Sequence, residues 1–171
     1  FESGDGTEVA PYVIRNASQL MYLATTALEG NTYEGKVISF AADIDMSGYT
    51  WAPIPLFKGT ILGNNFTISN LLIENNKSIT ADSSNYYHVG FIGCNSGTIS
   101  YLNFSNVNVT VTYGAVRAGA IVGDNNGTIK HCEVSGVVKV DTALTGDIMV
   151  GGIVGFSGSE SSITACTMSG T

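Results

Sequence analysis

The chain has 171 residues, of which 12% are charged and 44% are hydrophobic, and its formal net charge is −7. This composition excludes the low hydrophobicity and high charge that are typical of disordered chains, and it favours a single compact domain. Gly, Ser, Thr and Asn supply 69 of the residues, and because they form helices poorly, an all-β fold with many short strands is expected.

The charge distribution also excludes two classes of partner. Only 7 Lys and Arg stand against 14 Asp and Glu, and nucleic acid is bound by clustered positive charge, so no nucleic-acid partner is expected. No apolar run reaches the ~20 residues that span a bilayer, so no membrane insertion is expected. The chain begins at Phe1 and stops at Thr171 within a repeated pattern, which we interpret as a piece of a longer protein.

One segment near the N-terminus has helical periodicity. Asn16 and Gln19 are spaced as in a capping box, and Gly30 follows the expected end. We predict a helix near residues 17–29 that covers the open first turn of a stack of strands. The apolar residues of its buried face are Leu20, Leu23, Ala24, Ala27 and Leu28.

The rest of the N-terminal segment, residues 1–56, is expected to precede the repeats. Residues 36–40 are predicted to be the first strand, followed by a turn that contains Asp43 and Asp45. We expect these carboxylates to accept hydrogen bonds from backbone amides of the turn. The alternative, a calcium site, needs six or more oxygen ligands. Trp51, beside two prolines, is predicted to be a packing anchor.

Residues 57–171 contain internal repeats. Residues 93–104 align with residues 123–134, and a third copy covers residues 152–168, so that Ile99, Ile129 and Ile163 correspond. In an earlier and weaker copy, Ile68 falls 31 residues before Ile99.

Each repeat has a short apolar strand, an Asn/Gly turn and a strand with alternating apolar residues. Since one repeat cannot bury its own apolar face, we predict that parallel stacking forms a right-handed parallel β-helix of about 30-residue repeats. Gly and Asn are expected at the corners because they tolerate positive φ, and stacked Asn side chains are expected to hydrogen-bond between repeats.

The three cysteines, Cys94, Cys132 and Cys166, do not form an even set and have no zinc-ligand spacing. Cys132 and Cys166 occupy equivalent inward positions of adjacent repeats, ~4.8 Å apart. Because parallel side chains in register fit the disulfide torsion poorly, reduced thiols are favoured over a disulfide.

The carboxylates are spaced poorly for polysaccharide cleavage, an activity for which β-helical enzymes bring acids together on one face. No Asp or Glu lies between Asp82 and Asp124. The repeat alignment assigns Glu74 and Glu133 to the same position of the repeat, two repeats apart. It assigns Asp82 and Asp141 to a second shared position, also two repeats apart.

The histidines, His88 and His131, fall in different repeats at different offsets. No His-Glu-x-x-His motif and no nucleophile elbow is present. We therefore predict no catalytic residue, no metal site and no cofactor in this chain.

Tyr86 and Tyr87 are the candidate binding residues. They follow a polar segment, residues 75–85, that is longer than its counterparts in the other repeats. Adjacent tyrosines in a loop suit contact with a glycan or a protein. The alternative is that one tyrosine packs against the strands while the other is merely exposed.

The repeats resemble a known family. Gly-Ile-Val-Gly at residues 152–155, Gly-Thr-Ile at residues 97–99 and 127–129, and the segment 132–136 resemble the GLUG repeat of bacterial surface and secreted proteins. Residues 12–60 resemble the segment that precedes such repeats, so the resemblance covers about residues 11–170.

The resemblance implies an extracellular or cell-surface location in a bacterium. It also implies a non-catalytic role, either in adhesion to a host glycan or protein or as a structural spacer. A second hypothesis is an accessory region of an immunoglobulin A peptidase-like protein, which would hold no active site of its own. A third is a divergent β-helical carbohydrate-active enzyme.

Overall fold

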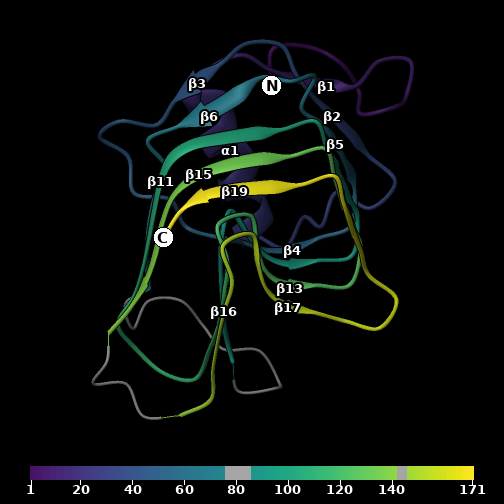
Figure 1. Ribbon diagram of the computed structural model, residues 1–171. Helices are drawn as coiled ribbons and strands as arrows, with labels where there is room; N and C mark the ends of the chain where they lie inside the picture. Colours follow the sequence, from purple (N-terminus) through teal and green to yellow (C-terminus); the bar gives the residue numbers. More distant parts are fainter. Residues whose placement is uncertain (76–85, 142–145) are drawn as a thin grey trace.

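The computed structural model describes residues 1–75, 86–141 and 146–171 (Figure 1). Most of the described secondary structure is strand, and one helix is present in this part of the chain. Every pairing between the strands of its four sheets is parallel. The prediction of an all-β chain with parallel strands is therefore confirmed.

Two of the sheets, A and B, hold most of the strands. Sheet A contains β1 (Tyr12–Ile14), β2 (Val37–Phe40), β5 (Thr60–Leu62), β10 (Thr98–Ser100), β14 (Thr128–Lys130) and β18 (Ser162–Thr164). Sheet B contains β3 (Ile44–Asp45), β6 (Thr67–Ser69), β7 (Leu72–Asn75), β11 (Asn103–Val111), β15 (Glu133–Val140) and β19 (Thr167–Gly170).

The other two sheets, C and D, are smaller. Sheet C contains β4 (Ile54–Phe57), β9 (Ile92–Asn95), β13 (Val122–Asn125) and β17 (Val154–Ser157). Sheet D contains β8 (Tyr87–Val89), β12 (Val116–Ala118) and β16 (Ile148–Val150). In Figure 1 the strands of sheets B and C form layers that follow the sequence colours from teal to yellow.

Three successive repeats visit the four sheets in the same order. β8 to β11, β12 to β15 and β16 to β19 each supply one strand to sheets D, C, A and B in turn. Ile99 pairs with Ile129, and Ile129 pairs with Ile163. The predicted correspondence of these three residues is therefore confirmed.

The predicted alignment of the earlier repeat is wrong. Ile61, not Ile68, pairs with Ile99, and Ile68 pairs with Phe104. The cause is a longer repeat, since Ile61 and Ile99 are 38 positions apart whereas Ile99 and Ile129 are 30 apart. The connection between β5 and β6 is two residues longer than that between β10 and β11, and eleven residues separate β7 from β8 whereas four separate β11 from β12. The Gly-Thr-Ile of residues 59–61 thus lies beside that of residues 97–99.

The predicted helix forms as α1 (Ala17–Leu28). The Asn16 side chain accepts a hydrogen bond from the Gln19 backbone N–H at 3.0 Å, as in a capping box. The returning bond differs, because Gln19 Oε1 accepts from Arg15 N–H and not from Asn16. Leu20, Leu23, Ala24 and Ala27 are buried as predicted, but Leu28 is 56% exposed.

The first strand differs from the prediction. β1 precedes the helix and pairs with β2, so the strand predicted at residues 36–40 is the second of sheet A. Helix α1 connects these two parallel strands. In Figure 1 it lies behind the strands, away from β19.

The core lies between the four sheets and continues from α1 through the repeats. Trp51 is 1% exposed and stacks on Phe91, with ring centroids 5.0 Å apart. Its indole N–H donates to the carbonyl oxygen of Phe91 at 2.8 Å. The prediction that Trp51 is a packing anchor is confirmed.

Apolar burial decreases in the last repeat. Ile99 and Ile129 have no exposed surface, whereas Ile163, their partner in β18, is 40% exposed. Val150 and Phe156 in the same repeat are 39% and 36% exposed. β16, β17, β18 and β19 each stand at the end of their sheet.

The glycines of the repeat turns have a role that the sequence did not reveal. Neither Gly97 nor Gly127 has positive φ; non-glycine residues such as Tyr101 and His131 occupy that region instead. A Cβ on Gly127 would lie 2.2 Å from the carbonyl oxygen of Gly97. These two glycines are therefore required for close approach of successive backbones, and the predicted reason, positive φ, is wrong for them.

Stacked asparagines fill the corner beside these glycines. Asn95 and Asn125 have no exposed surface, and Asn95 Nδ2 donates to Asn125 Oδ1 at 2.8 Å. Each side-chain oxygen also accepts the backbone N–H two residues later, from Gly97 and Gly127. The predicted hydrogen bonding between stacked asparagines is confirmed, and it satisfies polar groups that are costly to bury unpaired.

We expect Gly127→Ala to lower the free energy of unfolding by about 1–3 kcal/mol, because the added Cβ overlaps backbone that has no room to move. Urea denaturation followed by circular dichroism measures this loss. Ser96→Ala, at an exposed position of the neighbouring repeat, is the control and should change stability by less than about 0.5 kcal/mol. Equal stability of Gly127→Ala and the parent chain would contradict the close approach.

Candidate functional site

The carboxylates considered for catalysis are not brought together. Glu74 lies beside Thr110, near one end of β11, whereas the Glu133 N–H donates to Asn103 Oδ1 at 3.1 Å, at the other end of that strand. Seven residues separate these positions, and β11 bends between them at Asn106, whose φ is 53°; the span is therefore at most ~23 Å. The predicted shared offset of Glu74 and Glu133 is therefore wrong, for the same reason that misplaced Ile68.

Asp82, from the second predicted pair of acids, lies outside the described residues. Asp141 follows β15, at the far end of that strand from Glu133. Of the two acid pairs considered for carbohydrate cleavage, the structure therefore separates Glu74 from Glu133, and the pair that contains Asp82 stays a prediction.

Asp45 accepts a hydrogen bond from its own turn, as predicted, whereas the prediction is wrong for Asp43, which accepts from the neighbouring strand β6. Asp43 Oδ1 accepts from the Thr67 N–H at 2.8 Å, and Asp45 Oδ1 accepts from the Ser47 N–H at 2.9 Å. The Asn70 side chain donates to Asp45 at 2.8 Å and is the main cause of a lowered pKa for that carboxyl. Within residues 1–75, 86–141 and 146–171, no group of three or more His, Cys, Asp or Glu is placed to hold a metal ion.

The cysteines are free thiols. Cys132 is fully buried and Cys166 is half-buried, and their Sγ atoms donate to the carbonyl oxygens of Lys130 and Thr164. Burial raises the pKa of Cys132 to about 12. The reduced state favoured from the sequence is the state in the structure.

Two pairs of polar side chains that no sequence motif connects come into contact at the turns between the strands of sheet D and the strands of sheet C. His88 Nδ1 contacts Cys94 Sγ in one repeat, and Arg117 forms an ion pair with Asp124 in the next. Each pair joins residues six or seven positions apart on two strands connected by a short turn. The two pairs are related by strand register, because Arg117 pairs with His88 and Asp124 pairs with Cys94. Their spacings along the chain differ by one residue, so no clear signal of them is present in the sequence.

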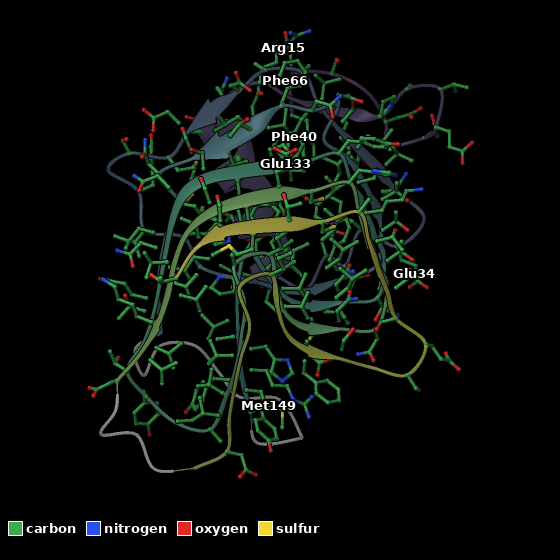
Figure 2. All side chains as sticks on the ribbon, viewed as in Figure 1. Arg15, Glu34, Phe40, Phe66, Glu133 and Met149 are labelled. Carbon is green, nitrogen blue, oxygen red and sulfur yellow. The ribbon has the colours of Figure 1, made fainter. Side chains whose placement is uncertain are left out.

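The Arg117 side chain lies between two aromatic rings. Its guanidinium carbon is 4.5 Å from the Tyr86 ring centroid and 4.2 Å from that of Phe156. The Arg117 and Asp124 side chains are only 16% and 8% exposed. We call Tyr86, Arg117, Asp124 and Phe156 the Arg117 cluster. Arg117 pairs with Met149 of β16, which Figure 2 labels, and Asp124 pairs with Phe156 of β17.

The two candidate binding residues thus have different surroundings. Tyr87 packs against the core and against Tyr113, with ring centroids 5.4 Å apart. Tyr86 contacts Arg117 through its ring, and its hydroxyl donates to Asp147 at 3.0 Å, which raises the pKa of the phenol. A binding role for either residue stays a prediction.

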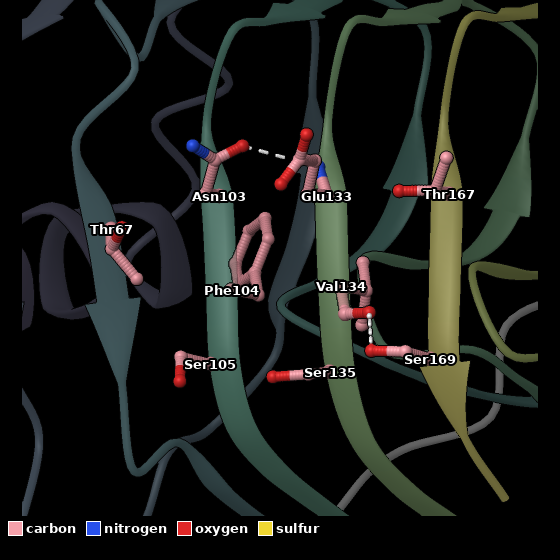
Figure 3. Close-up of a pocket in the computed structure, with 9 residues that line it drawn as sticks. All are labelled: Thr67, Asn103, Phe104, Ser105, Glu133, Val134, Ser135, Thr167 and Ser169. Carbon is pink, nitrogen blue, oxygen red and sulfur yellow. Dashed lines mark hydrogen bonds between the residues drawn. The ribbon is translucent and has the colours of Figure 1, made fainter.

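A pocket that the sequence did not indicate lies on the outer face of sheet B (Figure 3). It crosses β6, β11, β15 and β19, with polar residues at alternate positions. One row holds Thr67, Asn103, Glu133 and Thr167, and the second holds Ser105, Ser135 and Ser169. Phe104 and Val134, the remaining lining residues, lie between the rows.

The polar groups of this pocket are only partly used within the chain. The Asn103 side chain accepts the Glu133 N–H and donates to the Asn65 carbonyl at 3.3 Å. Glu133 is exposed, and its carboxylate accepts no hydrogen bond from the described residues. The pocket therefore offers hydroxyls, an amide and a carboxylate, which suit the binding of a polar molecule better than its chemical conversion.

Comparison with known proteins finds two relatives, each matched over a small part of its length. The chain is 30% identical to halomucin of Haloquadratum walsbyi over an alignment of 171 residues, which covers 90% of this chain and 2% of that protein. It is 30% identical to a protein of Evansella cellulosilytica, described as a Gly-rich membrane protein, over 140 residues, which cover 78% of this chain and 15% of that protein.

No protein-family model matches the chain, and no solved structure matches it significantly. Nor do residues 1–75, 86–141 and 146–171 include a helix with the length and apolar content needed to cross a bilayer.

We expect Asp124→Ala to destabilise the chain by about 3–5 kcal/mol, because it leaves the Arg117 charge buried without its partner. Urea denaturation measures the loss. The double variant Arg117→Met/Asp124→Ala should recover part of it. Glu34→Ala, which removes the exposed partner of Lys58, is the control and should cost about 0–1 kcal/mol. A loss no larger than that of the control would show that the Arg117 pair contributes little.

We expect Cys132 to be the least reactive thiol in the native protein. At pH 8 it is protonated, since its pKa is raised to about 12, and it has no exposed surface. Timed iodoacetamide labelling followed by peptide mass spectrometry should show alkylation of the half-buried Cys94 and Cys166 first. Faster labelling of Cys132 than of Cys166 would contradict the structure.

Proposed function

We propose that this chain is a non-catalytic module of a secreted or surface protein, and that it binds an extracellular glycan or protein. The fold that we propose for it is a parallel β-helix with right-handed connections, the usual hand for parallel strands. The fixed order of sheets D, C, A and B in three repeats supports this architecture. We propose that the repeats are of the GLUG type.

The observation that carries this proposal is the polar outer face of sheet B. Its side chains project from strands that are held in register and backed by fully buried residues such as Phe104 and Val109. A face of this kind is preorganised, so binding costs little conformational entropy. Its hydroxyl, amide and carboxylate groups are suited to hydrogen bonding with a polar ligand rather than to catalysis.

The two relatives support an extracellular location. One is named halomucin, and the other is described as a Gly-rich membrane protein. We propose that the parent of this chain is likewise secreted or attached to the cell surface. An accessory role beside a peptidase domain stays a prediction from the sequence resemblance.

We expect the purified chain to bind at least one class of extracellular macromolecule without converting it. Biolayer interferometry on immobilised mucin, immunoglobulin and matrix proteins should show saturable binding. Parallel reducing-end and peptide-release assays should show no turnover above a heat-denatured control. Turnover of any of these materials, or the absence of binding to all of them, would contradict the proposed function.

A further inference from the structure

The corner that leads into the polar face of sheet B presents aromatic rings. Tyr101 and His131 occupy equivalent positions with φ of 54° and 53°, two residues before Asn103 and Glu133. Their rings are stacked, with centroids 4.6 Å apart and planes 10° apart. The equivalent residue of the last repeat is Ala165, with φ of 50°.

The stack ends at His131 because Ala165 has no ring. β14 and β18 are paired through Lys130 and Thr164, so Ala165 follows beside His131. His131 is exposed, and a methyl group cannot stack on an imidazole as the Tyr101 ring does, so the aromatic stack does not continue onto the last repeat. His131 lies two residues before Glu133 in the sequence, and Glu133 pairs with Thr167 of β19. The side of His131 that faces the last repeat is therefore next to the strand that contains Thr167.

We propose that the pocket on sheet B binds a neutral saccharide, with one sugar ring stacked on His131 and its hydroxyls bonded to Glu133, Thr167 and Asn103. This inference rests on the proposed binding function and names the ligand class of the polar face. Sugar rings have an apolar C–H face and polar edges. An exposed aromatic ring next to a carboxylate, an amide and hydroxyls matches both.

The charge of the pocket selects against acidic sugars. Glu133 is its one ionised group, and the chain has a net charge of −7. A uronate or sulfate would be repelled, whereas a neutral hydroxyl can donate to the carboxylate and form the stronger, charge-assisted type of hydrogen bond.

The strand spacing suits a chain of sugars. Neighbouring strands lie ~4.8 Å apart, about the length of one pyranose residue in an extended polysaccharide. A neutral saccharide that crosses β11, β15 and β19 would therefore meet one polar side chain of the first row per sugar, in the order Asn103, Glu133 and Thr167.

The inference can be tested by NMR titration of the labelled protein with hexasaccharides of glucose, mannose, galactose and xylose. At least one should shift backbone signals of residues 131–135 and 165–169 in a saturable manner. A galacturonic acid hexamer should not. Glu133→Gln should weaken the affinity at least tenfold, because a hydrogen bond to a charged acceptor is replaced by a neutral one.

His131→Asn removes the ring while keeping a residue that tolerates positive φ, and it should also weaken binding about tenfold. Glu74→Gln is the matched control, because it makes the same charge change at an exposed residue of sheet B, far from the pocket. It should bind as the parent chain does. Thermal unfolding confirms that each variant is folded.

Two results would overturn the inference: no neutral hexasaccharide binds, or one binds equally well to Glu133→Gln and His131→Asn. If mucin or protein binding by the intact chain persists in either case, the saccharide pocket is wrong while the proposed binding function stands. If no macromolecule binds, both are wrong.

Discussion

The structure depends on parallel backbone pairing between repeats, in a register that shifts only locally, as between Phe104 and Val107 of β11. Because each strand hydrogen-bonds to its counterpart one repeat away, a residue's neighbours are the equivalent residues of the repeats on either side. Ile61, Ile99, Ile129 and Ile163 thus form one continuous apolar row. The same constraint requires glycine at positions 97 and 127, where backbone approaches backbone, and it allows buried asparagines to satisfy one another. Because the pairing register is the same from repeat to repeat apart from local shifts, equivalent apolar residues pack against one another in successive repeats.

The polar side chains, both the largely buried pairs between sheets D and C and the rows on the outer face of sheet B, follow the same register, but their chemistry changes from repeat to repeat. Where sheets D and C meet, successive repeats place a thiol–imidazole contact and then an ion pair at equivalent positions. On sheet B the first polar row changes from Thr67 to Asn103, Glu133 and Thr167. Inward positions must match their neighbours in size, whereas outward positions have only to be compatible with solvent. Variation is therefore concentrated on the faces available for binding, and a rigid core fixes the spacing of the varied groups.

The sequence predicted the features that depend on local pattern or on an unbroken period. Helix α1 was visible in its spacing and cap, and the Ile99, Ile129 and Ile163 row was visible because equal connections preserve the period. The alignment failed at Ile68 because the connections between β5 and β6 and between β7 and β8 are longer than their counterparts in the next repeat, and the same error misplaced Glu74. The pocket and the Arg117 cluster were missed for another reason. Their residues meet across strands or across a turn between sheets, and side-chain proximity of this kind is set by the fold and not by spacing along the chain.

The register between the first and second predicted repeats distinguishes the structure from the sequence alignment most directly. It can be measured by nuclear Overhauser effects between isotope-labelled isoleucine methyl groups in the otherwise deuterated protein. The structure predicts cross-peaks that connect Ile61 with Ile99, and Ile99 with Ile129, since these residues occupy neighbouring positions of sheet A. A cross-peak pattern that places Ile68 beside Ile99, with Ile61 remote from both, would contradict the account.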